Sequence, residues 1–331
     1  MKIRRQRGVA VVTALLLTTL AVTIVASLFW QQQVQVRSME NQRLQLQTRW
    51  ILRGALDLSR LILNQDLIDS PNFTQMNGVW ATPLEETRLD DYVERERLQG
   101  ENFNATLSGR MTDAQSRYNL GNLANNRQVN PDQVAVFQRL LSNLRLDEGL
   151  AQGVAELVMK SQSISTQQPA GSGPTSGTGS GVGVTDGTGG TGGSEPLALV
   201  RAEDLLAVSG FSPPAIDQLR DYVIVLPGRP TAINVNTAPA ELLSALVPGL
   251  SLSEAQAMVN ARKTAYYLNT GTFLGTAQMA GKKVVVPYDV RSDFFLAYSR
   301  VKLDRASLET QSLLHRPGQT AATSVEWIRE Y

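Results

Sequence analysis

The chain has 331 residues, of which 42% are hydrophobic and 18% charged, a composition typical of one or two packed domains. Cysteine is absent and His315 is the single histidine, which excludes disulfides, thiolate catalysis and metal sites built from histidine and cysteine. The formal net charge is +1, but four positive charges lie in the first seven residues, so the rest is slightly acidic. This balance argues against a general affinity for nucleic acid. Because no sequence motif of a catalytic nucleophile is present, we expect no enzyme.

An uncharged, largely apolar run extends from Val9 to Trp30. As a helix it would be about 33 Å long, roughly the thickness of a bilayer core. Apolar residues then recur at helical spacing to Ile68 without a proline, which predicts one helix with a transmembrane part over 9–30 and a stem over 31–68. The basic residues before the run predict a single pass through a membrane, with a cytoplasmic N-terminus and the bulk outside the cytoplasm.

The basic segment 1–8 ends in Gly8, directly before the apolar run, and resembles a type IV prepilin-like leader. The resemblance implies that a prepilin peptidase cuts between Gly8 and Val9 and methylates the new amine. Two other interpretations remain open. They are an uncleaved anchor that keeps Met1 and a secretory signal removed near residues 27–31.

Prepilins commonly carry glutamate at the fifth residue after the cut, where this chain has Thr13. In a filament, that glutamate is thought to pair with the terminal amine of the subunit ahead. A subunit with nothing ahead of it would bury an unpaired carboxylate at a cost of several kcal/mol. Threonine costs little because its hydroxyl can bond a carbonyl one turn earlier. Thr13 therefore predicts a subunit placed first in the filament.

Beyond the stem, residues 69–123 are expected to begin a small α+β domain, with a helix over 85–98 and a strand over 103–110. A helical pattern begins at Pro131 and Asp132 and runs to Val158. Residues 161–194 are rich in glycine and serine, which predicts a flexible loop. That loop contains a G-x-G-x-x-G pattern without a preceding strand, so we expect no nucleotide site there.

Helical patterns resume over residues 201–210 and 212–223, the second beginning at Ser212 and Pro213. Alternating apolar residues predict three C-terminal strands over 293–303, 307–316 and 323–331. The predicted fold class is therefore α+β. A small antiparallel sheet from 69–123 and 291–331 packs on the long N-terminal helix, and an all-α domain is inserted over 124–290.

Residues 233–263 within this insertion predict a helix-hairpin-helix-like unit. Asn236 or Thr237 can cap its first helix, and Ser251 with Glu254 forms a capping box for the second. Such units often grip DNA phosphates, but here a carboxylate stands at the second helix start and no lysine is close. Packing or protein interaction is the favoured role, and a membrane-anchored DNA-uptake receptor is the alternative.

Several features together resemble one family: the leader at Gly8 and Val9, Thr13, "TDAQSRYNLGNL" (112–123) and "INVNTAPAELLSAL" (233–246). This is the family of K-type minor pseudopilins of bacterial type II secretion, general secretion pathway protein K. The resemblance implies a bacterial inner-membrane protein whose bulk lies in the periplasm and has a pseudopilin fold with a large helical insertion. It implies a role at the pseudopilus tip, initiating assembly and aiding secretion across the outer membrane. The implied partners are the I- and J-type minor pseudopilins, the major pseudopilin, prepilin peptidase and the inner-membrane secretion platform.

Family members often carry an acidic stretch associated with calcium. In this chain "ELVMKSQSIS" (156–165) and the glycine-rich loop stand in that region, where Asp186 and Glu195 are the acids between Lys160 and Arg201. Two acids rarely supply the 6–8 oxygens that calcium takes. We therefore expect no metal site and no cofactor.

Overall fold

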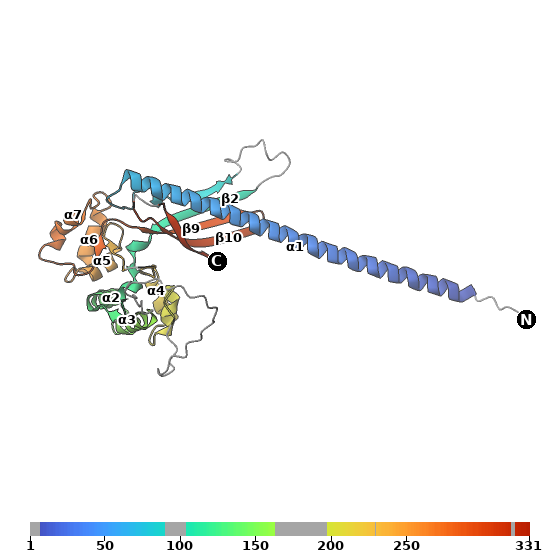
Figure 1. Ribbon diagram of the computed structural model, residues 1–331, viewed down its shortest axis with the longest axis horizontal. Helices are drawn as coiled ribbons and strands as arrows, with labels where there is room; N and C mark the ends of the chain where they lie inside the picture. The colour runs from blue at the N-terminus through green and yellow to red at the C-terminus, as the bar shows by residue number, and fades with distance from the viewer. Residues whose placement is uncertain (1–6, 90–103, 163–196, 229, 319–321) are drawn as a thin grey trace, which may run out of the picture.

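The computed structural model describes residues 7–89, 104–162, 197–228, 230–318 and 322–331. A single helix, α1 (Arg7–Asp69), forms the long axis of the molecule; its N-terminal half projects freely and its C-terminal half lies on a sheet (Figure 1). The predicted continuous helix is confirmed. Within the described ranges, α1 is the one helix long and apolar enough to cross a membrane. Leader residues 1–6 and most of the glycine-rich loop (163–196) lie outside these ranges.

The sheet has five antiparallel strands in the order β1-β2-β9-β10-β11. Their bounds are β1 (Leu84–Arg88), β2 (Ala105–Asp113), β9 (Phe294–Leu303), β10 (Ala306–His315) and β11 (Ser324–Glu330). The predicted strand before the insertion and the three C-terminal strands are confirmed.

The helix predicted over residues 85–98 is wrong for its first four residues, which belong to β1. Residues 90–98 lie outside the described part of the chain. Glu and Arg favour helices, but the difference in propensity is only a few tenths of a kcal/mol per residue. Pairing with β2 overrides it. Glu86 accepts a hydrogen bond from Thr106 at 2.8 Å and forms an ion pair with Lys302 at 3.0 Å.

The central strand β9 is buried on both faces because alternate side chains meet different partners. On one face, Phe295 and Ala297 pack with Leu56 and Leu63 of α1 and with Trp80. The opposite face contributes to a separate cluster with the helical domain. That cluster contains Ala114, Ile224, Leu226, Phe294, Leu296 and Leu313.

The chain between β2 and β9 forms the helical domain. Its α-helices are α2 (Pro131–Asn143), α3 (Leu150–Ser161), α4 (Pro213–Leu219), α5 (Ala240–Leu246), α6 (Leu252–Ala261) and α7 (Thr270–Leu274). The predicted starts at Pro131 and Pro213 are confirmed. The pattern predicted as one helical stretch to Val158 divides into α2 and α3, and residues 202–207 form a 3₁₀ helix instead of an α-helix. A single large apolar cluster extends through the domain.

The helix-hairpin-helix-like unit consists of α5 and α6. Gly249 takes φ +79° in the turn between them, a left-handed conformation that favours glycine. The capping box predicted at Ser251 and Glu254 is confirmed. The predicted cap at Asn236 or Thr237 is wrong, because Pro239 is the residue before α5 and both side chains are buried in other contacts.

Candidate functional site

The residues with the most distinctive chemistry lie where stem, sheet and helical domain meet. Asp113, the last residue of β2, is 1% exposed. Its Oδ2 accepts hydrogen bonds from Thr237 Oγ1 (2.5 Å), Ser292 Oγ (2.6 Å) and Asn234 Nδ2 (2.9 Å), and its Oδ1 accepts one from the Gln115 amide (2.8 Å). We call Asp113, Asn234, Thr237 and Ser292 the polar joint. It connects the end of β2, the segment leading to α5 and the entry to β9.

Burial raises the pKa of the Asp113 carboxyl, and the four hydrogen bonds oppose that shift by favouring the charged form. Each of the four donors is a polar group of the chain itself. A carboxylate satisfied in this way positions backbone segments and leaves no lone pair open toward solvent. The polar joint is therefore built for holding two parts of the molecule together.

A buried ion pair extends the joint to the stem. Arg316, 1% exposed, donates from Nη1 to Asp66 Oδ2 of α1 at 2.8 Å. Its Nη2 donates to Thr74 Oγ1 and to the Ser292 carbonyl, both at 3.0 Å. The Ser292 amide in turn donates to Thr74 Oγ1 at 3.1 Å. Burial raises the pKa of Asp66 although Arg316 opposes the shift. A continuous chain of hydrogen bonds thus runs from α1 to the helical domain.

The predicted processing residues Gly8 and Val9 lie in the first turns of α1, where the structure describes the backbone alone. Thr13 lies on the exposed part of α1, and its Oγ1 donates to the Ala10 carbonyl at 3.0 Å. This is the back-bond expected from the sequence. Thr13 and the polar joint are at opposite ends of the molecule, so the structure does not bring the predicted site residues together.

The helix-hairpin-helix-like unit is poorly suited to phosphate. Glu254 accepts from the Ser251 amide at 2.8 Å and pairs with Lys282 at 3.0 Å, so the N-terminus of α6 already carries a carboxylate. The hydrogen bond from the Ser251 backbone is the main reason that the pKa of Glu254 falls to about 2. Arg262 turns inward and donates to the Val235 carbonyl at 2.6 Å. A phosphate approaching α6 would meet a fixed negative charge, which disfavours the DNA-uptake alternative.

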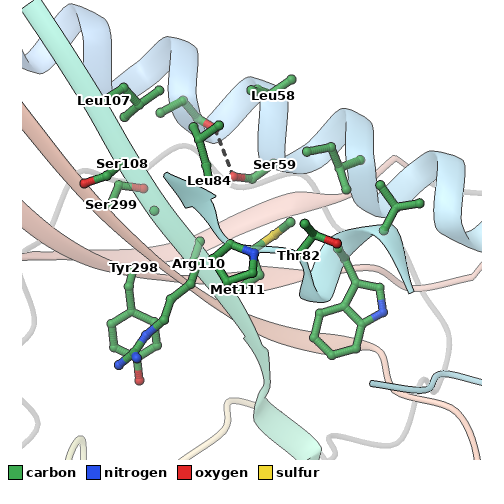
Figure 2. A pocket seen from close by; sticks show the side chains of 17 residues that line it. Leu58, Ser59, Thr82, Leu84, Leu107, Ser108, Arg110, Met111, Tyr298 and Ser299 are labelled. Carbon is green, nitrogen blue, oxygen red and sulfur yellow. Dashed lines mark hydrogen bonds between the residues drawn. The ribbon is translucent and has the colours of Figure 1, made fainter. Parts of the chain in front are cut away.

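An apolar pocket of about 240 Å³ lies between α1, the 3₁₀ helix η1 (Val79–Ala81), β1 and β2 (Figure 2). Leu58 of α1 faces Leu84 and Leu107 across it. Arg110 lies at its edge, where its guanidinium stacks on the Tyr298 ring 5.1 Å from the centroid. The lining is mainly apolar and contains no carboxylate, histidine or lysine that could activate its serine hydroxyls, so the pocket is suited to accept an apolar side chain.

Within the residues that the structure describes, no three histidine or acidic side chains converge as a metal-binding group. The acids singled out near the predicted loop, Asp186 and Glu195, lie outside those residues.

Two models of known protein families match this chain, and both are described as Type II secretion system (T2SS), protein K. They match residues 116–228 and 233–291, together more than half of the chain. The type II secretion system protein K of Klebsiella pneumoniae is 29% identical over 328 residues, covering 96% of this chain and 94% of that protein. The protein of the same name from Pseudomonas aeruginosa is 32% identical over 159 residues, covering 46% of this chain and 44% of that one.

Among solved structures, the chain resembles one in the crystal structure of the GspK-GspI-GspJ complex from the enterotoxigenic Escherichia coli type 2 secretion system. The TM-score is 0.64 at 20% identity, with 89% of this chain and 99% of that chain covered. The two chains therefore share a fold.

Proposed function

Because the chain belongs to the family of type II secretion system protein K, it is a minor pseudopilin, and we propose that it occupies the tip of the pseudopilus. There it helps to initiate pseudopilus assembly and so supports protein secretion across the outer membrane. The observation that carries the proposal is the position of the helical domain. Helices α5, α6 and α7 lie beyond the sheet, at the end of the molecule opposite the free part of α1 (Figure 1).

A filament shaft is made by packing stems side by side. A subunit within the shaft needs room for the subunit ahead of it, in the direction away from the membrane. Here that direction is occupied by a domain with its own extensive core. At the tip the same bulk is accommodated without a clash. Thr13 supports the placement independently, since the tip subunit has no amine ahead of it to neutralise.

The N-terminal apolar helix anchors the chain in a membrane. We propose a single pass through the inner membrane, with the N-terminus in the cytoplasm and the sheet and helical domain in the periplasm. The structural relative comes from a GspK-GspI-GspJ complex, which supports the I- and J-type minor pseudopilins as direct partners of this chain. The major pseudopilin below, the prepilin peptidase and the secretion platform complete the proposed set of partners.

Tip placement is tested by inserting an epitope directly after Ser180 of the glycine-rich segment and labelling sheared pseudopili with gold-conjugated antibody. We expect label at one end of each filament. As a control, the same epitope on the major pseudopilin should label the whole length. Label from this chain at regular intervals along the shaft would contradict the proposal.

Processing is tested by the mature N-terminus. We expect an N-methylated Val9, and Gly8→Leu should block cleavage because the branched side chain crowds the peptide carbonyl. Unprocessed chain keeps its four leader charges, which oppose its leaving the bilayer. Unchanged mobility and secretion in Gly8→Leu would rule out the leader assignment.

We also propose that the chain works without a resident metal or cofactor, on the basis of its sparse acidic residues near the glycine-rich loop. Excess chelator should leave the melting temperature of the full chain unchanged. A clear fall in the melting temperature, reversed by calcium, would contradict this.

A further inference from the structure

Within the described residues, the last strand of the sheet, β11, has no paired strand on its outer side. It pairs with β10 and ends the strand order of the sheet. Among the described residues, no backbone group outside β10 bonds the backbone of β11. Its outward N–H and C=O groups are therefore free to pair with another extended segment, as unpaired edge strands commonly are. Both edge strands carry a register shift in their pairing, β1 between Leu84 and Thr87 and β11 opposite Leu313 and Leu314.

The face of β11 toward the stem carries Val325 and Ile328, and Glu330 at its end pairs with Arg49 of α1 at 3.1 Å. A groove of about 700 Å³ lies between this face and α1. Val325 and Ile328 line it from the strand, and Leu46 and Trp50 line it from the helix. Trp50 is 66% exposed and Ile328 47%, so large apolar area is left in water although the two elements lie next to each other. A strand added to β11 would cover these side chains.

The other face of β11 carries Trp327 and Arg329 and, beside His315, Glu326. A cleft of about 250 Å³ separates it from the helical domain, and its lining contains four arginines but two acidic residues, Glu203 and Asp221. Arg117 donates weakly to Tyr298 Oη at 3.5 Å, and Arg329 donates to the Val200 carbonyl at 2.7 Å. Within the described chain, neither guanidinium has a carboxylate within 4.0 Å. Arg329 also stacks on Trp327, 3.9 Å from the ring centroid.

We propose that β11 is an acceptor edge for an extended segment of another protein, whose side chains are apolar on the stem face and acidic on the other. The added strand makes main-chain hydrogen bonds to β11, as in other cases of strand addition. Side chains of a strand alternate between faces, so one register places its apolar residues in the groove against Trp50 and Ile328. The acidic residues between them then lie on the side of Arg329, whose guanidinium can bind a carboxylate through two parallel hydrogen bonds.

The test uses the full chain in nanodiscs and a fluorescent seven-residue peptide of alternating valine and glutamate. Two control peptides have the same length: one replaces glutamate with lysine, and the other carries N-methyl groups on alternate amides. We expect the valine–glutamate peptide to bind at least ten-fold more tightly than either control. Equal binding of the N-methylated peptide, or no saturable binding of the valine–glutamate peptide, would overturn the proposal.

Two variants locate the binding. Ile328→Lys places a charge in the apolar groove and should weaken peptide binding at least ten-fold. Val285→Lys is the matched control, because Val285 is a similarly exposed apolar residue of the helical domain, and it should bind as the unmodified chain does. Arg329→Ala should weaken binding three- to ten-fold, with a smaller effect at high salt. Equal weakening of peptide binding by Val285→Lys would overturn the proposal. Self-association of the chain that Ile328→Lys abolishes would also overturn it, because the edge would then bind a second copy of this chain.

Discussion

The helical domain and the stem–sheet unit are held together in different ways. The helical domain has one apolar cluster that connects its six α-helices within the described chain. The stem–sheet unit has several smaller clusters and, beside them, the buried Asp66–Arg316 pair. The two parts meet partly through the polar joint around Asp113. Apolar packing tolerates small shifts, whereas converging hydrogen bonds fix distance and direction. This difference suits a subunit whose helical domain must stay at a set angle on its stem.

The largest expected effect comes from removing one member of the buried pair. Arg316→Ala leaves Asp66 buried without its partner and should lower the free energy of unfolding by about 3–5 kcal/mol. Chemical unfolding of the full chain measures it. Arg300→Ala is the control on the same sheet, because Arg300 pairs with Glu309 at an exposed position. If both substitutions cost the same, the buried pair does not hold the stem–sheet unit.

Asp113→Asn tests the polar joint with a side chain of nearly the same shape. The side-chain N–H₂ of the asparagine would face one of the groups that now donates to the Asp113 carboxylate, so two donors would meet. We expect the free energy of unfolding to fall by about 1–3 kcal/mol. Thr237→Val, which removes one of the four donors, should cost less. If Asp113→Asn leaves the free energy of unfolding unchanged, the four converging donors do not contribute to stability.

The raised pKa of Asp113 also predicts how the free energy of unfolding depends on pH. The pKa of Asp113 in the folded chain is raised above its ordinary value of 3.8, so the folded chain keeps a proton that the unfolded chain releases. The stability contributed by Asp113 is therefore greatest in acid and falls as the pH rises from 3.8 through the folded pKa. The stability difference between the unmodified chain and Asp113→Asn should narrow over that window. A difference that widens with rising pH would contradict the burial argument.

A smaller effect is expected at the capping box of α6. The pKa of Glu254 is lowered from 4.5 to about 2, so its stabilising contribution is present above pH 4.5 and is lost as the pH falls toward 2. Glu254→Gln should slightly lower the melting temperature at neutral pH, with the difference vanishing in acid. Glu156→Gln, which removes an exposed helical ion pair, serves as the control. If the difference in melting temperature between Glu254→Gln and the unmodified chain is the same at every pH, the charge of Glu254 is not its cause.

The smallest effect is expected from deleting Gly171 to Gly193. The free energy of closing a loop changes by only about 0.6 kcal/mol per doubling of length, and this segment has few apolar side chains to pack. The melting temperature and secretion should stay near those of the unmodified chain. A large fall in melting temperature would show that the segment docks on the domain.

The sequence predicted the elements whose signals are local. The uncharged run from Val9 predicted α1, and Ser251 with Glu254 predicted the start of α6, because the contacts that decide them lie within a few residues. Residues 85–88 were predicted incorrectly because their partners in β2 and β9 lie about 20 and 216 residues away. Helix propensity carries no information on such pairing.

The polar joint could not be predicted for the same reason. Asp113 and Asn234 are 121 residues apart, and Asp113 and Ser292 are 179 apart. A usable signal was nonetheless present: Asn234 and Asn236 alternate with apolar residues in a segment where polar side chains would otherwise be exposed. Polar residues placed in this way indicate buried partners, but the sequence does not say which partners. Thr237 was interpreted as a helix cap because the capping rule is local and its contact with Asp113 is not.

Thr13 provides the most direct test of the tip placement. Pseudopilus yield and secretion should be measured with Thr13→Glu and Thr13→Ala beside the unmodified chain. A carboxylate at this position costs at most about 2.5–3.5 kcal/mol, the value for the centre of a membrane helix, when no amine ahead can pair with it. At the tip, Thr13→Glu should therefore be neutral or impaired, and Thr13→Ala should be close to the unmodified chain. A subunit inside the shaft would gain a contact from glutamate, so a clear gain over both threonine and alanine would contradict the tip placement.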